Sequence, residues 1–174
     1  MLDKYGADAT RWYLLHTSPA WSPTKFDEDG LIEITSKFFG TLRNVYNFFV
    51  LYSNQDNIDI GKVFVDYRKR PELDRWILSK YNRLIDDVTE EMNRYDHMKT
   101  VRKIQNFVVE DLSNWYIRRA RRRFWAEELT EDKKSVYATT YEILVGVAQL
   151  MAPFAPFISD EIYTDLTGAE SRMP

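Results

Sequence analysis

The sequence predicts an all-α protein, a helical bundle of five to six helices, on three observations. Apolar residues recur at spacings of three and four along most of the chain, which places them on one face of a helix. Glycine and proline number only six each among 174 residues, and most of them stand between these periodic segments. Hydrophobic residues make up 44% of the chain, which is enough to build a core at this length.

The first predicted helix covers about residues 8–17. Asp8 can cap its N-terminus, and Gly6 marks a break just before it. Residues 18–23 contain two prolines, which restrict the backbone and lack amide donors. We therefore expect an extended loop there.

A second helix is predicted from Asp27 to about Ser53. Asp27 is a good N-cap, and the acidic residues after it suit the positive end of the helix dipole. Gly40 in the middle costs about 1 kcal/mol relative to alanine, so its presence predicts the close approach of another helix. The apolar positions of this helix are Leu31, Ile34, Phe38, Leu42, Val45, Phe49 and Tyr52.

Residues 54–70 have the weakest pattern in the chain. Asn-Gln-Asp-Asn opens the segment and Gly61 interrupts it, which disfavours a long helix. β-Branched residues at 58, 60, 63 and 65 could form a short extended stretch. We interpret the segment as a linker between two helical parts.

Two long helices are expected after the linker. Pro71 suits the first position of a helix that runs to about Arg94. Asp96 can cap the next helix, which reaches about Ala126. The expected buried positions are Leu73, Trp76, Ile77, Leu84, Val88 and Met92 in the first and Val101, Ile104, Val108, Leu112 and Trp115 in the second.

Two further helices complete the predicted bundle. Thr130 or Glu131 begins the first of them. Pro153 and Pro156 end it, because proline cannot continue a helix, and Ser159 is expected to cap a short final helix.

The composition excludes several classes of protein. There is no cysteine, which excludes a disulfide scaffold and a thiolate metal site. His16 and His97 lack the spacing of a zinc site, so we expect both to be structural or solvated. No apolar run approaches the ~18 residues that a membrane span needs, and the N-terminus lacks a signal-peptide pattern.

Charge is sorted along the chain although the net charge is only -3. Residues 99–123 contain eight lysines and arginines against two acids, and residues 127–132 contain four acids and no base. Within the basic stretch, five arginines fall in the six residues 118–123. Like charges three and four positions apart on a helix repel, so such a run is tolerated where an anion neutralises it. Guanidinium groups suit phosphate and the neighbouring aromatic rings can stack on bases, which indicates nucleic acid as the ligand.

The helical period assigns these arginines to different faces. At about 100° per residue, Arg119 and Arg123 continue the predicted buried stripe, with Arg122 at its edge. We expect acids such as Asp111, or the acidic stretch that follows, to hold these three. The same stripe places Trp115 in the core.

Arg118 and Arg121 point away from that stripe and are expected to be free to meet phosphate. The candidate RNA-contact residues are Arg118, Arg121, Arg122, Arg119, Arg123, Trp125 and Tyr116.

Several segments resemble class I aminoacyl-tRNA synthetases, and isoleucyl-tRNA synthetases in particular. The segment 4–11 is similar to the stretch that follows the Lys-Met-Ser-Lys-Ser loop of the class, and 73–79 is similar to the start of its helical anticodon-binding domain. The segments that resemble the isoleucine enzymes are Ser18-Pro19, Trp21-Ser22-Pro23, Phe26–Gly30 and Asp111–Trp125, and Met151–Phe157 resembles the family's closing helix junction.

The resemblance implies a tRNA-binding piece of a larger enzyme that uses ATP to ligate isoleucine to its tRNA. The catalytic signatures His-Ile-Gly-His and Lys-Met-Ser-Lys-Ser are absent, so this chain alone is expected to be inactive. We expect it to hold no catalytic residue, cofactor or metal, since the parent's missing catalytic domain would use the ATP. Its expected partners are isoleucine tRNA and the catalytic and C-terminal domains of the same polypeptide, in the cytoplasm and without a membrane.

The resemblance also implies a domain organisation. Residues 1–54 would be connecting helices after the catalytic domain, 55–70 a linker, and 71–174 the anticodon-binding bundle. Two alternatives stay open. One is the same domain of a valyl-, leucyl- or methionyl-tRNA synthetase, and the other is a helical protein-interaction module with an arginine-rich face.

Overall fold

The computed structural model describes residues 2–19, 21–23 and 25–169, and within these ranges it contains helices and no strand. Six helical rods and one short N-terminal turn are present there, so the predicted all-α bundle of five to six helices is confirmed. In the same ranges, no helix has both the length and the apolar character needed to cross a bilayer. The elements are α1 (Leu2–Tyr5), α2 (Ala7–Thr17), α3 (Glu28–Glu33), η1 (Ile34–Phe39), α4 (Gly40–Gln55), η2 (Ile60–Lys62), η3 (Tyr67–Lys69), α5 (Glu72–Asn93), α6 (His97–Asn106), η4 (Phe107–Ile117), α7 (Arg118–Phe124), α8 (Glu131–Met151) and α9 (Pro156–Thr167).

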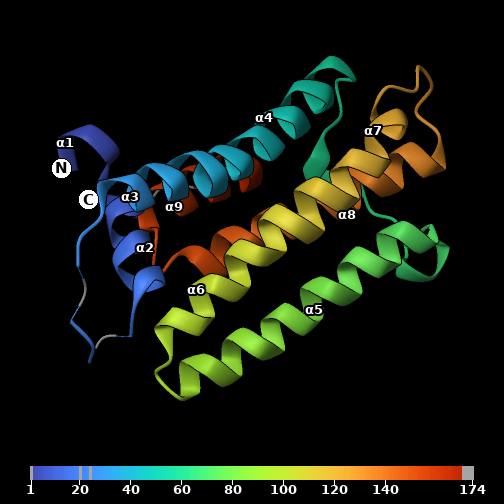
Figure 1. Cartoon of the computed structure of the whole chain (residues 1–174). Coiled ribbons are helices and arrows are strands. Elements are labelled where there is room, and N and C mark those ends of the chain that lie inside the picture. The colour runs from blue at the N-terminus through green and yellow to red at the C-terminus, as the bar shows by residue number, and fades with distance from the viewer. Residues whose placement is uncertain (1, 20, 24, 170–174) are drawn as a thin grey trace.

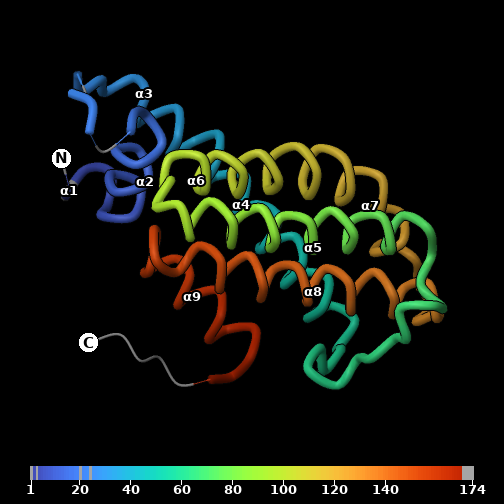
Figure 2. The backbone as a smooth tube through the Cα atoms, turned by 90° about the horizontal axis from the view of Figure 1, so that it is seen from below, coloured from blue at the N-terminus to red at the C-terminus, as the bar shows by residue number. Residues whose placement is uncertain are grey.

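Two of the rods are composite. α3, η1 and α4 form one continuous helix, as do α6, η4 and α7, and in each the middle piece has π-helical hydrogen bonding. The α6–η4–α7 rod and α8 run through the middle of the bundle, with α4 and α5 along opposite edges (Figure 1). α1, α2 and α3 gather at one end (Figure 2), and the buried apolar side chains of all the rods form one core.

Three helix starts lie where their capping residues predicted. The side chain of Asp27 accepts two backbone N–H bonds from the first turn of α3, each 3.3 Å long. Asp96 and Thr130 each accept one, of 3.0 and 3.1 Å, at the starts of α6 and α8. Pro71 immediately precedes α5 instead of occupying its first position.

Two predicted caps are wrong, and for one of them the true cap comes from a distant part of the chain. α2 begins after Gly6, whose φ of 83° suits glycine, and the carboxylate of Asp8 does not cap it. That carboxylate instead accepts backbone N–H bonds of 3.4 and 2.7 Å from the first turn of α9, about 150 positions away. α9 begins at Pro156, so Ser159, its predicted cap, lies inside the first turn.

The close helix approach predicted at Gly40 occurs elsewhere. A Cβ atom added to Gly40 would meet only the carbonyl of Thr35 in its own rod, at 3.6 Å. At Gly146 of α8, a Cβ atom would lie 1.8 Å from the hydroxyl of Tyr81 on α5. Gly146 is therefore the glycine that makes room for a side chain of another rod, and the prediction at Gly40 is wrong.

The segment between α4 and α5 is attached to α8 through charged groups. Arg70 is buried and donates two hydrogen bonds, of 2.6 and 3.0 Å, to the carboxylate of Glu142. Asp56 forms an ion pair of 2.6 Å with Lys133, which is also buried. The segment contains the two 3₁₀ turns η2 and η3. The division of the chain at residues 54 and 71 stays a prediction.

The π-helical segment η4 changes which side of its rod is buried. Up to Leu112 the predicted stripe lies in the core. Trp115, which is predicted to be core, is 47% exposed, so that prediction is wrong. The fully buried positions that follow are Tyr116, Ala120 and Phe124, the last with 1% exposure. A π-helical turn holds more residues than an α-helical turn, so it rotates every later residue about the rod axis.

Candidate nucleic-acid interface

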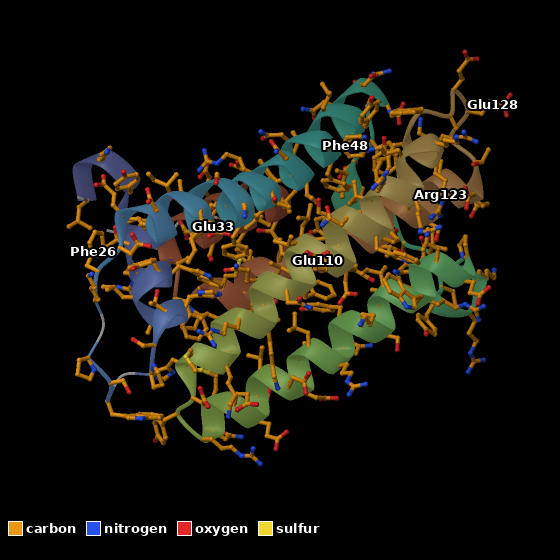
Figure 3. All side chains as sticks on the ribbon, in the orientation of Figure 1. Phe26, Glu33, Phe48, Glu110, Arg123 and Glu128 are labelled. Carbon is orange, nitrogen blue, oxygen red and sulfur yellow. The ribbon has the colours of Figure 1, made fainter. Side chains whose placement is uncertain are left out.

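The arginine run forms α7 at one end of the molecule, the end opposite Phe26 (Figure 3). Ala120 and Phe124 are its buried positions and determine which side of the helix faces the core. The ring of Phe124 packs edge-on against Tyr137 of α8, with the centroids 5.1 Å apart. This orientation leaves four of the five arginines exposed.

These four residues, Arg118, Arg119, Arg121 and Arg122, form a cationic patch that we call the arginine surface. At about 100° per residue, Arg118 and Arg122 point away from the core and the other two flank them. Among the residues that the structure describes, no ion pair or side-chain hydrogen bond involves these four guanidinium groups. Their charges are available to an anionic ligand.

Aromatic rings lie beside the surface on two sides. The guanidinium carbon of Arg119 is 3.8 Å from the ring centroid of Trp115. Trp115 is in turn 6.1 Å from Trp76 of α5, measured between centroids. On the other side, Arg121 lies 6.0 Å from the ring of Phe48 on α4. A half-exposed indole with a guanidinium over it is the kind of flat face on which nucleobases stack.

Behind the surface lies a polar cluster of Asp74, Tyr116, Arg123 and Ser135, which we call the Asp74 centre. The fully buried carboxylate of Asp74 accepts hydrogen bonds from the hydroxyls of Tyr116 (2.9 Å) and Ser135 (2.6 Å). Arg123 donates to both of its oxygens, with Nη2 and Oδ2 2.8 Å apart. The centre joins α5, η4, α7 and α8, and it holds the C-terminal turn of α7 in place.

The electrostatics of the Asp74 centre preserve its charges. Burial and the adjacent Asp74 charge raise the pKa of the Tyr116 phenol well above its usual range, and Arg123 offsets part of this effect. Burial alone would lower the pKa of Arg123, but its bonds to Asp74 and Asp132 outweigh burial and leave that pKa raised. The phenol therefore stays neutral and the guanidinium stays charged and paired, so Arg123 is not available to a ligand.

The structure separates the five arginines differently from the sequence-based prediction. Arg118 and Arg121 are exposed, as predicted. The prediction that acids hold Arg119 and Arg122 is wrong, because neither forms an ion pair with a carboxylate in the part of the chain that the structure describes. The cause is the rotation introduced by η4, which turns them out of the predicted stripe.

The remaining candidates also divide. Arg123 is paired as predicted, and one partner, Asp132 at 2.9 Å, belongs to the expected acidic stretch. Tyr116 is a candidate RNA contact in the sequence but has no exposed surface, so it cannot stack on a base in this structure. Trp125 is 54% exposed. The RNA contacts of the exposed candidates stay predictions.

One sequence signal could have found the true register. Positions 108, 112, 116, 120 and 124 carry Val, Leu, Tyr, Ala and Phe, an apolar row at a constant spacing of four. The predicted stripe instead enters the arginine run at 119. Asp74 has no comparable local signal, because its charge partner Arg123 lies 49 positions away.

Comparison with known proteins shows the family of the chain. The family described as the anticodon-binding domain of tRNA ligase matches residues 74–173, a range that contains both the Asp74 centre and the arginine surface. The chain belongs to this family. Isoleucine–tRNA ligases of Porphyromonas gingivalis and Bacteroides thetaiotaomicron are 49% and 50% identical to it, over 99% and 98% of its length. That of Dehalococcoides mccartyi is 45% identical over 95%.

These relatives are much longer than the chain. It spans 15% of the length of the first two and 16% of the third. The anticodon-binding fold is also similar to part of the LeuRS of Agrobacterium radiobacter K84, solved in a ternary complex with tRNA. That likeness has a TM-score of 0.66 and 21% identity, and covers 98% of this chain and 19% of that one. At this identity it shows the fold alone, whereas the sequence relatives favour the isoleucyl interpretation over the leucyl one.

Proposed function

We propose that this chain is the anticodon-binding part of an isoleucine–tRNA ligase and that it binds isoleucine tRNA through the arginine surface. The observation that carries the proposal is the set of four exposed, unpaired arginines beside Trp115 in a member of the anticodon-binding family. A surface of this kind would otherwise destabilise its own helix, because the charges repel one another. A polyanion removes that repulsion.

Each part of the interface has a physical role in this proposal. The arginines bind backbone phosphates and release the counterions condensed on the RNA, which favours association at low salt. Such contacts position the RNA without reading its sequence. Trp115 and the guanidinium of Arg119 offer a stacking face to an unpaired base, and unpaired bases are the usual target of sequence-specific RNA recognition.

The proposal assigns the chemistry to the rest of the parent polypeptide. A catalytic domain of the same polypeptide would use ATP to activate isoleucine and transfer it to the tRNA in the cytoplasm. This chain would hold the tRNA in register and would bind no cofactor itself. Its further partners would be the catalytic and C-terminal domains of that polypeptide.

A binding titration against isoleucine tRNA, a non-cognate tRNA and heparin, at low and moderate salt, tests the proposal. We expect a preference for the isoleucine tRNA that survives moderate salt and is lost in the Arg118→Ala, Arg121→Ala double variant. The matched control is Lys37→Ala with Arg43→Ala, which removes two exposed cations from the η1–α4 rod and the same net charge.

The other outcomes separate the alternatives. If the chain binds all three polyanions equally and salt abolishes that binding, the arginine surface is a non-specific cationic patch. No binding at low salt would contradict RNA recognition by this chain and favour a protein-interaction module. Equal losses in the control and the double variant would mean that net charge matters and the location of the arginines does not.

A further inference from the structure

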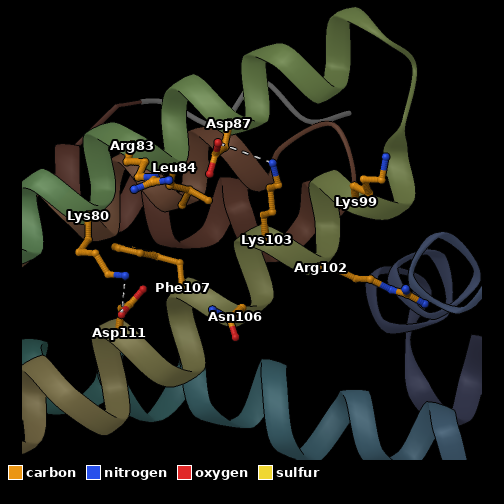
Figure 4. Close-up of a pocket in the computed structure, with 10 residues that line it drawn as sticks. All are labelled: Lys80, Arg83, Leu84, Asp87, Lys99, Arg102, Lys103, Asn106, Phe107 and Asp111. Atoms are coloured by element: carbon orange, nitrogen blue, oxygen red, sulfur yellow. Dashed lines mark ion pairs between the residues drawn. The ribbon is translucent and has the colours of Figure 1, made fainter.

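A second basic site lies between α5 and the α6–η4 part of the central rod. It is a cleft of about 470 Å³, and five of its ten lining residues are lysine or arginine against two aspartates. Figure 4 shows Lys80 and Arg83 reaching into it from α5 and Lys103 from α6. We call it the α5–α6 groove. None of the candidate residues from the sequence lies in it.

The cations of the α5–α6 groove are neutralised to different degrees. Lys80 pairs with Asp111 at 3.3 Å. Lys103 donates a hydrogen bond of 3.0 Å to the buried carboxylate of Glu91 and also pairs with Asp87 at 3.6 Å. Arg83 is exposed and has no ion pair or side-chain hydrogen bond with any residue in the described part of the chain. The groove therefore has one fully available guanidinium, beside Lys80 with a single carboxylate partner and Lys103 held by two carboxylates.

Two other lining cations contribute less. Arg102 turns away from the groove toward α2, where it donates hydrogen bonds of 2.9 and 3.3 Å to the last carbonyls of that helix (Figure 4). Lys99 pairs with Asp96 at 2.8 Å. The binding capacity of the groove consequently rests mainly on Arg83 and Lys80, because Glu91 and Asp87 hold Lys103.

The α5–α6 groove is continuous with the arginine surface along one seam. Trp76 meets Trp115, and one turn further along both helices Lys80 meets Asp111. The seam then passes Arg83 and reaches Lys103. Positions 103, 107, 111, 115 and 119 each directly precede a buried position of the rod, so the groove and the stacked Arg119 lie on the same side of its buried row. About 20 Å of helix separates the two ends of the seam, at ~1.5 Å or less per residue.

We propose that the α5–α6 groove binds backbone phosphates of the same RNA that occupies the arginine surface, with Arg83 as its main phosphate contact. The inference rests on the proposed function. A nucleic-acid strand carries one negative charge per nucleotide, so a strand along the seam would place several phosphates between Arg119 and Lys103. The groove reads no bases and adds affinity and orientation.

Three variants test the groove with two RNAs, isoleucine tRNA and a short RNA duplex of unrelated sequence, each titrated over a range of salt concentrations. Arg83→Ala should lower the affinity for both RNAs severalfold. It should also reduce the slope of log affinity against log salt concentration by about one. Asp111→Asn should raise the affinity for both RNAs severalfold at low salt, because it frees Lys80 from its carboxylate partner. Arg43→Ala is the control, since it removes one exposed positive charge on the opposite edge of the bundle.

The results separate the groove from the anticodon proposal. If Arg83→Ala behaves like Arg43→Ala while the wild-type chain prefers isoleucine tRNA, the groove inference is overturned and the proposed function stands. If Arg83→Ala lowers the affinity for both RNAs but the wild-type chain shows no preference for isoleucine tRNA, the groove inference is supported and the proposed function fails. Failure of the wild-type chain to bind either RNA at low salt overturns both. Unfolding midpoints of all variants verify that any loss of binding is not a loss of folding.

Discussion

Arg119 and Arg123 are one helical turn apart on α7, and the structure uses them in opposite ways. The side chain of Arg123 is 15% exposed and bonds Asp74 and Asp132, whereas Arg119 is exposed and lies over Trp115. Local sequence is similar around both. The difference follows from the register that η4 imposes and from two acids, Asp74 and Asp132, that lie beside Arg123.

The contrast shows how the chain can concentrate arginines without losing its fold. Pairing Arg123 with a buried carboxylate fixes the end of α7 to α5 and α8, and the unpaired arginines on the rest of the helix remain presented to solvent. A buried ion pair adds little net stability compared with apolar packing, because both charges lose their hydration. We therefore infer that the main role of the Asp74 centre is to fix the position of α7 against α5 and α8. Its removal should disturb the packing of α7 as well as break the hydrogen bonds of the centre.

The largest expected effect is that of Asp74→Ala. It leaves the hydroxyls of Tyr116 and Ser135 buried without their acceptor and Arg123 with Asp132 as its remaining partner, so we expect the free energy of unfolding to fall by about 3–5 kcal/mol. Urea unfolding measures it. The matched control is Asp86→Ala on the exposed face of the same helix, which should change stability by no more than about 0.5 kcal/mol. A loss below about 1 kcal/mol for Asp74→Ala would show that the centre does not anchor α7.

The sequence predicts the features of this fold that depend on neighbouring residues. Asp27, Asp96 and Thr130 cap helices through bonds that span two or three positions, so their local pattern was sufficient. The apolar stripe of the central rod is also predicted correctly as far as Leu112, within η4. Composition and spacing likewise indicated the arginine run as the candidate interface.

The features that the sequence missed depend on distant residues or on a change of helical period. The carboxylate of Asp8 caps α9 from the other end of the chain, and Asp74 meets Arg123 across 49 positions. Gly146 accommodates the side chain of Tyr81 from another helix, and the residues around Gly146 do not predict this contact. The assignments of Trp115 and Tyr116 failed together, because both assumed an uninterrupted α-helix through a π-helical segment.

Trp115→Ala tests the exposed side of the comparison. Loss of the stacking face should weaken binding of isoleucine tRNA by about 1–3 kcal/mol, the usual contribution of one stacked base. Stability should fall far less than in Asp74→Ala, because the indole is half-exposed. Trp21→Ala, which removes another exposed indole near the opposite end, is the control for RNA binding. Equal affinity of the Trp115→Ala variant and the wild type would remove Trp115 from the interface.

The pH dependence of stability tests the buried side. Burial and the Asp74 charge raise the pKa of Tyr116 in the folded chain, so the unfolded chain releases this proton at a lower pH than the folded chain does. Stability from this group is complete below pH ~10, the ordinary pKa of tyrosine, and is lost as pH rises from there toward the folded pKa. The maximum slope is about 1.4 kcal/mol per pH unit.

Urea unfolding between about pH 8 and pH 11 should therefore show a shallower alkaline decline in Tyr116→Phe than in the wild type. Comparing the two cancels the titration of lysines over the same range. Tyr95→Phe, at an exposed position, should keep the wild-type profile. Identical slopes in all three proteins would mean that the phenol of Tyr116 ionises as readily in the folded chain as in the unfolded one.

The smallest expected effect has the opposite sign. Arg118 has Arg121 and Arg122 three and four positions after it, and like charges at these spacings destabilise a helix by about 0.2–0.5 kcal/mol per pair. Arg118→Gln removes the charge with little change in helix propensity, so it should raise the free energy of unfolding by a few tenths of a kcal/mol at low salt. The gain should disappear at high salt, which screens the repulsion. The same variant should bind RNA less tightly, and that combination distinguishes an arginine kept for a ligand from one kept for the fold. A loss of stability in Arg118→Gln would instead place Arg118 with Arg123, among the arginines that hold the bundle together.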